Sequence, residues 1–364
     1  MDVGLKIKIK RKRDDAMLFM LIDMDYFFAA CEELKRPELK NKPFVVGTSP
    51  ESQKEFGVVQ TSNYVARKFG IKSGMPVTKA LPLCKELIYI ESHDDYYESI
   101  SERIMDILRS YSLPMEIMSI DECAIELGEI STDEAVRLGN AIKERIKGKI
   151  GLPCTIGISS SKIYSKMVCD EAKPDGVKAV PADQIREFIK DKEVSKIPGI
   201  GPKAAAQLEG IGIARIREIA DKSPMLLMEK MGSLGTFVYN VARGTDESGI
   251  QHSDQLSIGR ETTLISGAGT ESIDAAIERL AEQTVSEVER RKMMFKGISA
   301  KVRYSDFSEK IRSANLKNYT ASKEILVRKS KELIADLIKG KQVRKVGVRV
   351  YALTDASGQN KLFY

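Results

Sequence analysis

Two apolar segments of the sequence carry acidic residues where a buried strand would normally carry aliphatic ones. Asp23 and Asp25 interrupt the run MLFMLIDMD, and Asp121 and Glu122 interrupt SIDECAIEL. Buried carboxylates resist ionisation unless a positive charge compensates them. The chain has only two histidines, and its five widely spaced cysteines form no CxxC pair. A hard dication with oxygen ligands is therefore the natural compensator, and the residue types predict a Mg²⁺ site.

The spacing of these acids indicates what such a site could do. Asp23 and Asp25 share one face of a strand because side chains alternate, whereas adjacent Asp121 and Glu122 reach one site only at a bulge or a strand end. If the strands are neighbours, Asp23 and Asp121 can bridge two ions about 3.5–4 Å apart, as in-line phosphoryl displacement requires. A polymerase, a nuclease and a nucleotide cyclase all fit this chemistry. The alternative for either segment alone is strand-end acids that face solvent.

Three further side chains could hold the phosphates of such a substrate. In TSNYVARKFG, Tyr64 and Arg67 are three residues apart on one helix face, where they offer a hydroxyl and a guanidinium. In EAKPDG, Lys173 lies beside the end of a helix, where its ammonium could meet the same anion. The alternative for each of these side chains alone is an ordinary solvent-facing position on a helix, with no role in binding.

The segment IPGIGPKAAAQLEGIGI, residues 197–213, has the pattern of a helix-hairpin-helix. Its Gly-rich turn precedes a helix that starts near Pro202, so backbone N–H groups would face outward at a helix N-terminus. Such a motif grips the DNA backbone without reading sequence. The alternative is a Gly-rich helix connection that serves packing alone.

Length and composition predict a soluble protein of two to four compact units. The chain has 364 residues, of which 42% are hydrophobic and 30% charged. No apolar run approaches the ~20 residues that span a bilayer. The basic N-terminus lacks the apolar stretch of a secretory signal, and a cytoplasmic location is therefore expected.

Charge is distributed unevenly along the chain. The net charge is +6, but residues 258–364 contain 21 Lys and Arg against 13 Asp and Glu, whereas residues 17–257 contain 31 against 36. A basic C-terminal unit is expected to bind a polyanion, although a solvated charged surface would have the same composition.

Periodicity predicts alternating strands and helices up to about residue 180, then a helical segment, a polar linker and a separate α+β unit. The first unit is expected to begin with a strand over 17–25 and to contain an amphipathic helix over 95–111. In the last unit, helices are expected over 271–292 and 321–339, with strands at SIGRETTL, GISAKVRYSD and KVGVRVYAL.

Seven segments together closely resemble the Y-family translesion DNA polymerases, in particular the archaeal-type DNA polymerase IV branch. They occur in the family's order and approximate spacing from Met17 onward: LIDMDYFFAACEE, TSNYVARKFGIKSGMP, SIDECAIEL, GISSSKIYSKMVCDEAKPDG, IPGIG, SIGRETTL and RKVGVRV. The resemblance implies a template-directed, low-fidelity DNA polymerase that inserts deoxynucleotides opposite damaged bases by two-metal nucleotidyl transfer, without a proofreading exonuclease. The alternatives are a palm-type nucleotide cyclase and a catalytically inactive DNA-binding relative.

The resemblance also implies roles for individual residues. Asp23, Asp121, Glu122 and the backbone carbonyl of Met24 match the ligands of two Mg²⁺ ions, for which Mn²⁺ can substitute, and Asp25 is not a principal ligand. Phe28 matches the steric gate, a bulky ring that excludes a ribose 2′-hydroxyl. The nucleotide-binding set is Phe27, Phe28, Thr61, Tyr64, Arg67 and Lys173, although a core position fits Phe27 better. The DNA-binding set is Gly199, Gly201, Lys203, Arg260, Arg344, Lys345 and Arg349.

The implied architecture is an α+β multidomain protein, a right-hand polymerase with a mixed-sheet palm, small fingers and a helical thumb, plus a C-terminal α+β little finger. The expected segments are a basic N-terminal extension (1–16), palm (17–33 and 93–180), fingers (34–92), thumb with the helix-hairpin-helix (181–245), linker (246–257), little finger (258–355) and tail (356–364).

Expected partners are primer-template DNA and deoxynucleoside triphosphates, with no membrane, and the expected state is a monomer. The tail resembles a compressed sliding-clamp peptide through Gln359, Leu362, Phe363 and Tyr364, but its spacing departs from the usual form. Residues 1–16 have no counterpart in the family pattern.

Overall fold

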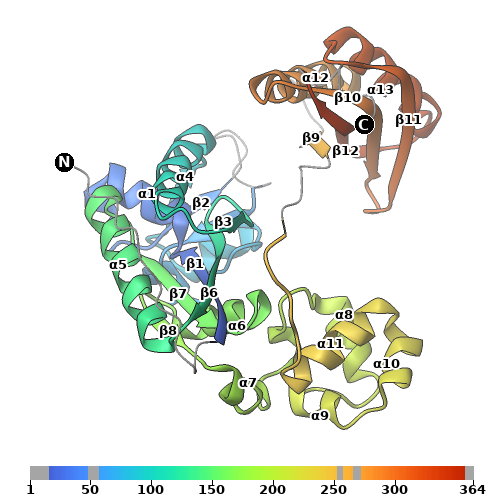
Figure 1. Ribbon diagram of the computed structural model, residues 1–364. Helices are drawn as coiled ribbons and strands as arrows, with labels where there is room; N and C mark the ends of the chain where they lie inside the picture. Colours follow the sequence, from blue (N-terminus) through green and yellow to red (C-terminus); the bar gives the residue numbers. More distant parts are fainter. Residues whose placement is uncertain (1–15, 48–56, 252–256, 265–271, 357–364) are drawn as a thin grey trace. The chain divides into compact units, whose positions relative to one another are not determined.

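The computed structural model describes residues 16–47, 57–251, 257–264 and 272–356 of the chain (Figure 1). Contacts divide the chain into two compact units, Met1–Gln251 and His252–Tyr364. No helix among the described residues is long and apolar enough to cross a membrane.

A five-stranded sheet forms the centre of the first unit, with the order β5-β6-β1-β7-β8. Its strands are β1 (Ala16–Met24), β5 (Met115–Ile117), β6 (Glu122–Ile130), β7 (Cys154–Ser159) and β8 (Val177–Ala179). Neighbours pair antiparallel, except that β7 and β8 are parallel. Strand β1 lies in the middle and is buried on both faces, which explains its nearly continuous apolar sequence.

Helices cover both faces of this sheet (Figure 1). They are α1 (Phe27–Lys35), α4 (Asp94–Arg109), α5 (Thr132–Ile150) and α6 (Lys162–Ala172). Met20 and Ile22 of β1 pack into the core that includes α1, α4 and α5, whereas Leu21 packs with Cys169 of α6 on the opposite face. By alternation, Asp23 is on the face that α6 covers.

A small subdomain between α1 and α4 has a three-stranded sheet in the order β3-β2-β4. Its elements are β2 (Phe44–Gly47), β3 (Val59–Ser62), α2 (Tyr64–Arg67), α3 (Val77–Ala80) and β4 (Ile88–Glu91). The Asn63 side chain caps α2 by accepting a hydrogen bond from the Ala66 N–H. This cap sets where the helix with Tyr64 and Arg67 begins.

Residues 181–244 are helical and share one apolar core with α6. The helices are α7 (Ala182–Ile189), α8 (Pro202–Glu209), α9 (Ile216–Ala220), α10 (Pro224–Met231) and α11 (Ser233–Arg243). Short 3-10 helices occur at Pro37–Leu39, Leu81–Leu83 and Val194–Lys196.

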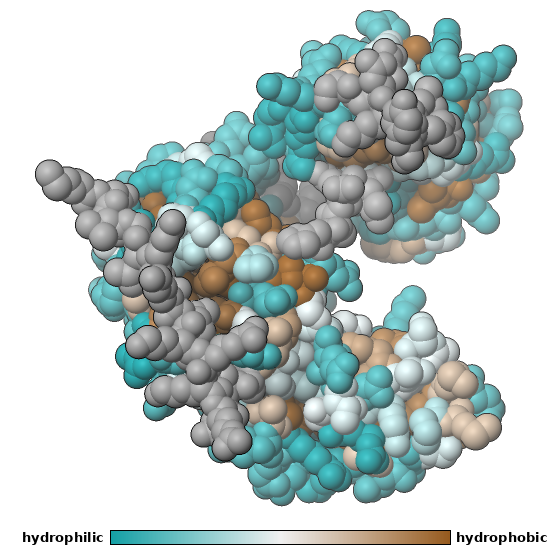
Figure 2. All heavy atoms as spheres, viewed as in Figure 1, coloured by the Kyte–Doolittle hydropathy of each residue, from teal (hydrophilic) through white to brown (hydrophobic). Residues whose placement is uncertain are grey.

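The second unit is a four-stranded antiparallel sheet, in the order β11-β10-β12-β9, with two helices packed on one face. Its elements are β9 (Ser257–Thr263), α12 (Ile273–Arg290), β10 (Met293–Tyr304), β11 (Glu309–Thr320), α13 (Lys323–Ile338) and β12 (Val343–Asp355). On the side seen in Figure 2, hydrophilic residues cover most of this unit. Strand β11 was not expected from the sequence, because as an exposed edge strand it lacks an alternating apolar pattern.

Candidate active site

The acids at the ends of strands β1 and β6 lie next to each other, although nearly a hundred residues separate them in sequence. The antiparallel register pairs Asp23 directly with Glu122. The Met24 N–H donates a hydrogen bond of 2.9 Å to the Asp121 carbonyl, which anchors the residue that precedes β6. Asp23 is 4% exposed, whereas Asp121 and Glu122 are half-buried.

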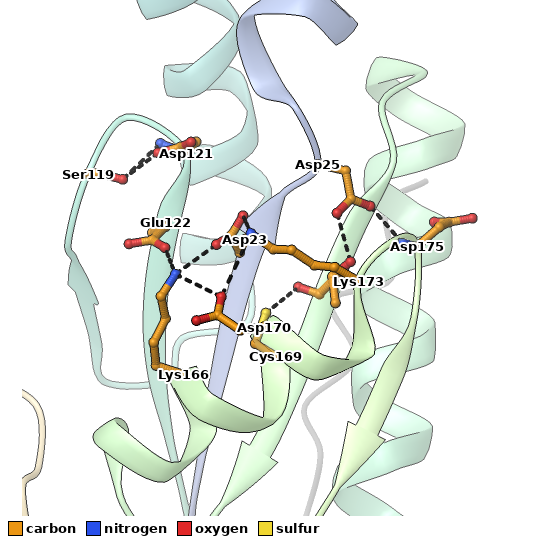
Figure 3. A network of polar contacts seen from close by, with 11 residues as sticks. Asp23, Asp25, Ser119, Asp121, Glu122, Lys166, Cys169, Asp170, Lys173 and Asp175 are labelled. Atoms are coloured by element: carbon orange, nitrogen blue, oxygen red, sulfur yellow. Dashed lines mark hydrogen bonds and ion pairs between the residues drawn. The ribbon is translucent and has the colours of Figure 1, made fainter. Parts of the chain in front are cut away.

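Asp121 is outside the strand, so strict alternation does not force its side chain away from that of Glu122. β6 begins at Glu122, and Asp121 lies in the bend before it. In this structure the Asp121 carboxylate accepts a hydrogen bond of 2.5 Å from the Ser119 hydroxyl rather than contacting Asp23 (Figure 3).

Two lysines from one stretch of chain reach Asp23. Lys166, on helix α6, places its Nζ 2.9 Å from Asp23 Oδ2 and also pairs with Glu122 and Asp170. Lys173, at the C-terminal end of α6, has its Nζ 2.7 Å from Asp23 Oδ1. Figure 3 shows the Lys166 ammonium between the carboxylates of Asp23 and Glu122.

The two paired carboxylates have opposite pKa shifts. Burial would raise the pKa of Asp23, but the neighbouring Glu122 carboxyl and the two ammonium groups outweigh burial and hold that pKa below its ordinary value. Burial and the interaction with Asp23 raise the pKa of Glu122. Two acids this close cannot both ionise freely without a cation, so the proton is retained more strongly on Glu122.

Asp25 belongs to a different hydrogen-bond set. Its carboxylate accepts a bond of 2.8 Å from the Thr155 hydroxyl and one of 2.7 Å from the Asp175 N–H, and it is 1% exposed. Strand β1 has ended at Met24, so the expected common face with Asp23 does not extend to Asp25. Asp25 instead ties the end of β1 to the loop that carries Lys173.

The side chains expected around a nucleotide occur on α1, β3 and α2. The Tyr26 and Tyr64 rings meet edge to face with centroids 4.8 Å apart, and the Arg67 guanidinium lies 4.9 Å from the Tyr64 ring centroid. Arg67 Nε donates to the Ser62 carbonyl at 3.0 Å, and Thr61 pairs with strand β2. Burial, and to a lesser extent nearby acids, raise the pKa of Tyr64 to about 12, so its hydroxyl stays protonated.

Phe27 and Phe28 differ in exposure as the first two residues of α1. Phe27 is 2% exposed and is part of the core. Phe28 is half-buried, and its ring stacks on that of Tyr97 with centroids 4.7 Å apart and an angle of 16° between the ring planes.

The helix-hairpin-helix segment has an open turn before α8. Gly199 has a φ of +90°, which favours glycine, and Gly201 is the N-terminal cap residue of α8. A Cβ at either glycine would meet nothing within 4 Å, and Lys203 is exposed. The turn therefore presents its backbone without cover from the rest of the first unit.

The four C-terminal cations named above do not share one face of the sheet. Lys345 and Arg349 alternate with the buried Val348 and are on the face that lacks helices, whereas Arg260 pairs with Val348 on the helix side. Arg344 lies at an irregularity in β12, with its guanidinium 4.9 Å from the Phe307 ring centroid.

Comparisons with known proteins account for nearly the whole chain. The family model described as the impB/mucB/samB family matches residues 22–170, its C-terminal domain model matches 255–362, and the IMS family HHH motif matches 181–213. DNA polymerase IV 1 of Methanosarcina mazei is 37% identical over 94% of this chain and 97% of its own length. The DNA polymerase IV of Nitrosopumilus maritimus is 30% identical, over 94% and 97%.

The chain belongs to this family of Y-family, DNA polymerase IV-type enzymes. Solved Y-family structures are also similar. A Y-family DNA polymerase chimera of Dbh and Dpo4 has a TM-score of 0.83 and 26% identity, covering 93% of this chain and 100% of its own. An insertion ternary complex of Dbh DNA polymerase has a TM-score of 0.69 at 26% identity, over 92% and 98%. The predicted family and the predicted α+β polymerase fold are confirmed.

Dependence on divalent metal ions is general for Y-family polymerases, and the donors in this site fit such an ion. Asp23 and Glu122 present hard carboxylate oxygens, and they already share one cation, the Lys166 ammonium. Within the described part of the chain, no group of three or more His, Cys, Asp or Glu side chains is arranged to hold a metal. The Asp121 carboxylate is hydrogen-bonded to the Ser119 hydroxyl in this structure.

The pairing of Lys166 with the acids of the site was not predicted from the sequence. Lys166 and Lys173 are seven residues apart, two helical turns, so a shared helix face was a usable signal for both. Residues 1–15, and the clamp-like Gln359, Leu362, Phe363 and Tyr364, lie outside the described residues.

Proposed function

We propose that the protein is a template-directed translesion DNA polymerase of low fidelity, which extends a primer by divalent-metal-dependent nucleotidyl transfer and has no proofreading exonuclease. The observation that carries the proposal is the pairing of Asp23 with Glu122 beside Asp121 at the ends of β1 and β6, in a chain of this family. In the reaction, the primer 3′-hydroxyl attacks the α-phosphate of the incoming nucleotide and pyrophosphate leaves.

Two Mg²⁺ ions would be held by the carboxylates of Asp23, Asp121 and Glu122 and by the Met24 carbonyl, with Mn²⁺ as a substitute. When bound, such ions stabilise the attacking and leaving oxygens of an in-line displacement. Asp23 is suited to this role because its depressed pKa keeps it ionised at neutral pH. Lys166 keeps the paired carboxylates compensated in the free protein.

The triphosphate would be held by Tyr64, Arg67 and Lys173, with Thr61 close by on β3. Tyr64 donates through a hydroxyl that remains protonated, and the exposed Arg67 offers a guanidinium fork to phosphate oxygens. Lys173 would exchange its contact with Asp23 for the phosphate charge that accumulates as pyrophosphate leaves. The Phe28 ring would lie under the sugar and exclude a 2′-hydroxyl, while Phe27 holds α1 in the core.

DNA would be gripped through its backbone, with little sequence preference. Gly199, Gly201 and Lys203 supply a backbone-lined turn in the thumb, residues 181–245, and the little finger, residues 258–355, contributes its cations. The little-finger cations assigned to this role are Arg260, Arg344, Lys345 and Arg349. The palm would comprise residues 17–33 and 93–180, and the fingers residues 34–92.

Clamp binding through the tail, a monomeric state and a cytoplasmic location stay predictions. Removal of residues 356–364 is expected to abolish stimulation by a sliding clamp without changing extension in its absence.

Primer extension tests the polymerase assignment. The wild-type protein is expected to extend a primer only with a template, deoxynucleotides and magnesium or manganese, and Asp121→Ala with Glu122→Ala is expected to bind DNA but not extend it. Asp133→Ala, in the first turn of α5, is the matched control. Product formation without a primer would favour a cyclase, and DNA binding without extension by the wild type would favour an inactive relative.

A further inference from the structure

The buried acid Glu32 occupies a position where core packing alone would favour an aliphatic residue. It lies on helix α1 and its exposed fraction is 0%. The Tyr97 hydroxyl donates to Glu32 Oε1 at 2.7 Å, and His93 Nδ1 lies 2.7 Å from the same oxygen. Glu32 Oε2 accepts no hydrogen bond from the described residues, but it forms an ion pair of 3.4 Å with the Arg36 guanidinium. A fully buried carboxylate with one oxygen that accepts no hydrogen bond costs stability, so its presence in the core calls for another reason.

That reason lies one turn earlier on the same helix. Phe28 and Glu32 are four residues apart and therefore share one face of α1. Tyr97, fully buried on α4, contacts both: its ring stacks on Phe28 at 4.7 Å, and its hydroxyl is held by Glu32. The Tyr97 ring is thus fixed at its face and at its end by residues of a single helix.

This arrangement controls where the Phe28 ring can go. The Phe28 and Tyr97 rings are stacked with 16° between their planes, so the position of the Tyr97 ring sets that of the Phe28 ring. The hydrogen bond of 2.7 Å to Glu32 Oε1 fixes the hydroxyl end of the Tyr97 ring, because hydrogen bonds are directional. Phe28 is half-buried, so one part of its ring is exposed while one face packs on the Tyr97 ring. The position of the Phe28 ring therefore depends on Tyr97.

We infer that Glu32 and Tyr97 are positioning residues that hold the Phe28 ring against the sugar, and that they set how strongly ribonucleotides are rejected. The inference rests on the proposed role of Phe28 as the steric gate. Glu32 and Tyr97 are both fully buried, so they would act through Phe28 rather than by contact with the nucleotide. With the hydrogen bond removed, the Phe28 ring yields to a 2′-hydroxyl, so ribonucleotides bind better.

Single-nucleotide insertion with matched deoxy- and ribonucleotides tests the inference, with the ratio of kcat/KM values as the readout. Tyr97→Phe is expected to lower the deoxy-to-ribonucleotide ratio of kcat/KM by about three- to tenfold, mainly through a lower ribonucleotide KM, because the hydrogen bond to Glu32 is lost. Glu32→Gln is expected to lower the ratio by about threefold, because its amide oxygen still accepts from the Tyr97 hydroxyl but is a weaker acceptor than a carboxylate. Tyr96→Phe removes a phenol hydroxyl from the adjacent residue of α4 and is expected to leave the ratio within about twofold of wild type.

A double-variant comparison separates positioning from general packing. In a Phe28→Ala background, Tyr97→Phe is expected to change the ratio no further, since the ring that it positions is gone. An additive effect in that background, or a wild-type ratio in both Tyr97→Phe and Glu32→Gln while Phe28→Ala lowers it strongly, would overturn the inference and leave the steric gate standing.

A failure of the proposed steric-gate role of Phe28 would give a different result in the same assay. If Phe28→Ala keeps the wild-type ratio, the steric-gate role and the inference both fall, while primer extension still reports on the polymerase assignment. Circular dichroism melts check folding, and if Tyr97→Phe does not fold, Glu32→Gln, which keeps the side-chain shape, decides the question.

Discussion

Removal of the Lys166 ammonium is expected to tighten divalent-cation binding to the DNA-free protein. Its Nζ is 2.9 Å from Asp23 Oδ2 and also pairs with Glu122, so an incoming dication must displace it or tolerate its repulsion. Two unit charges about 4 Å apart interact by about 4 kcal/mol at an effective dielectric constant of about 20. Lys166 is 19% exposed and can swing toward water, so only part of this repulsion persists. We expect Lys166→Met to bind Mn²⁺ about ten- to a hundredfold more tightly.

Titration of free Mn²⁺ by electron paramagnetic resonance measures this affinity without DNA or turnover. Lys162→Met is the matched control, since Lys162 begins the same helix and forms an ion pair of 2.8 Å with Glu116. Its Mn²⁺ affinity is expected to equal that of wild type. If Lys166→Met bound Mn²⁺ no more tightly than wild type, the idea that this ammonium occupies the cation position would be refuted.

The same titration has an expected pH dependence. Burial and Asp23 raise the pKa of Glu122 above its ordinary 4.5, so Glu122 takes up its proton at a higher pH than a free carboxyl does. Mn²⁺ needs the ionised form, and affinity should therefore fall as the pH is lowered toward that raised pKa. Lys166→Met removes a cation that lowers the Glu122 pKa, so its Mn²⁺ binding should weaken at a higher pH than wild-type binding does.

Two further predictions concern packing and DNA affinity. A Cβ at Gly157 would lie 2.2 Å from the main chain of α6, so Gly157→Ala should lower the free energy of unfolding, measured with denaturant, by about 3 kcal/mol. Gly148→Ala, where a Cβ on α5 would meet nothing within 4 Å, should leave the free energy of unfolding unchanged. Equal effects of the two substitutions would contradict the packing argument. Glu261 pairs with Lys345 at 2.7 Å on the helix-free face of the C-terminal sheet, so Glu261→Gln should tighten primer-template binding by about three- to tenfold in fluorescence anisotropy at low salt. Glu282→Gln removes an acid from helix α12, and an equal gain there would mean that net charge alone is responsible.

Local patterns in the sequence were sufficient to predict helices with an apolar face and strands with an apolar or alternating sequence. The amphipathic pattern of residues 95–111 predicted helix α4, and the apolar run that ends in Asp23 predicted strand β1. Strand β11 had no such signal, because four of its residues are charged and it lies at the edge of the described sheet. Its extended form depends on pairing with β10, which no local pattern encodes.

The sequence by itself determined the family, the acids available for metal chemistry and the cations available for phosphate. The register of β1 against β6, which pairs Asp23 with Glu122, was decided only in the tertiary structure. The tertiary structure also decided two hydrogen bonds between distant residues. One joins Thr155 to Asp25, 130 positions apart, and the other joins Tyr97 to Glu32, 65 positions apart. The physical reason is that side-chain periodicity is a property of neighbouring residues, whereas strand register and helix contacts follow from how the whole core packs.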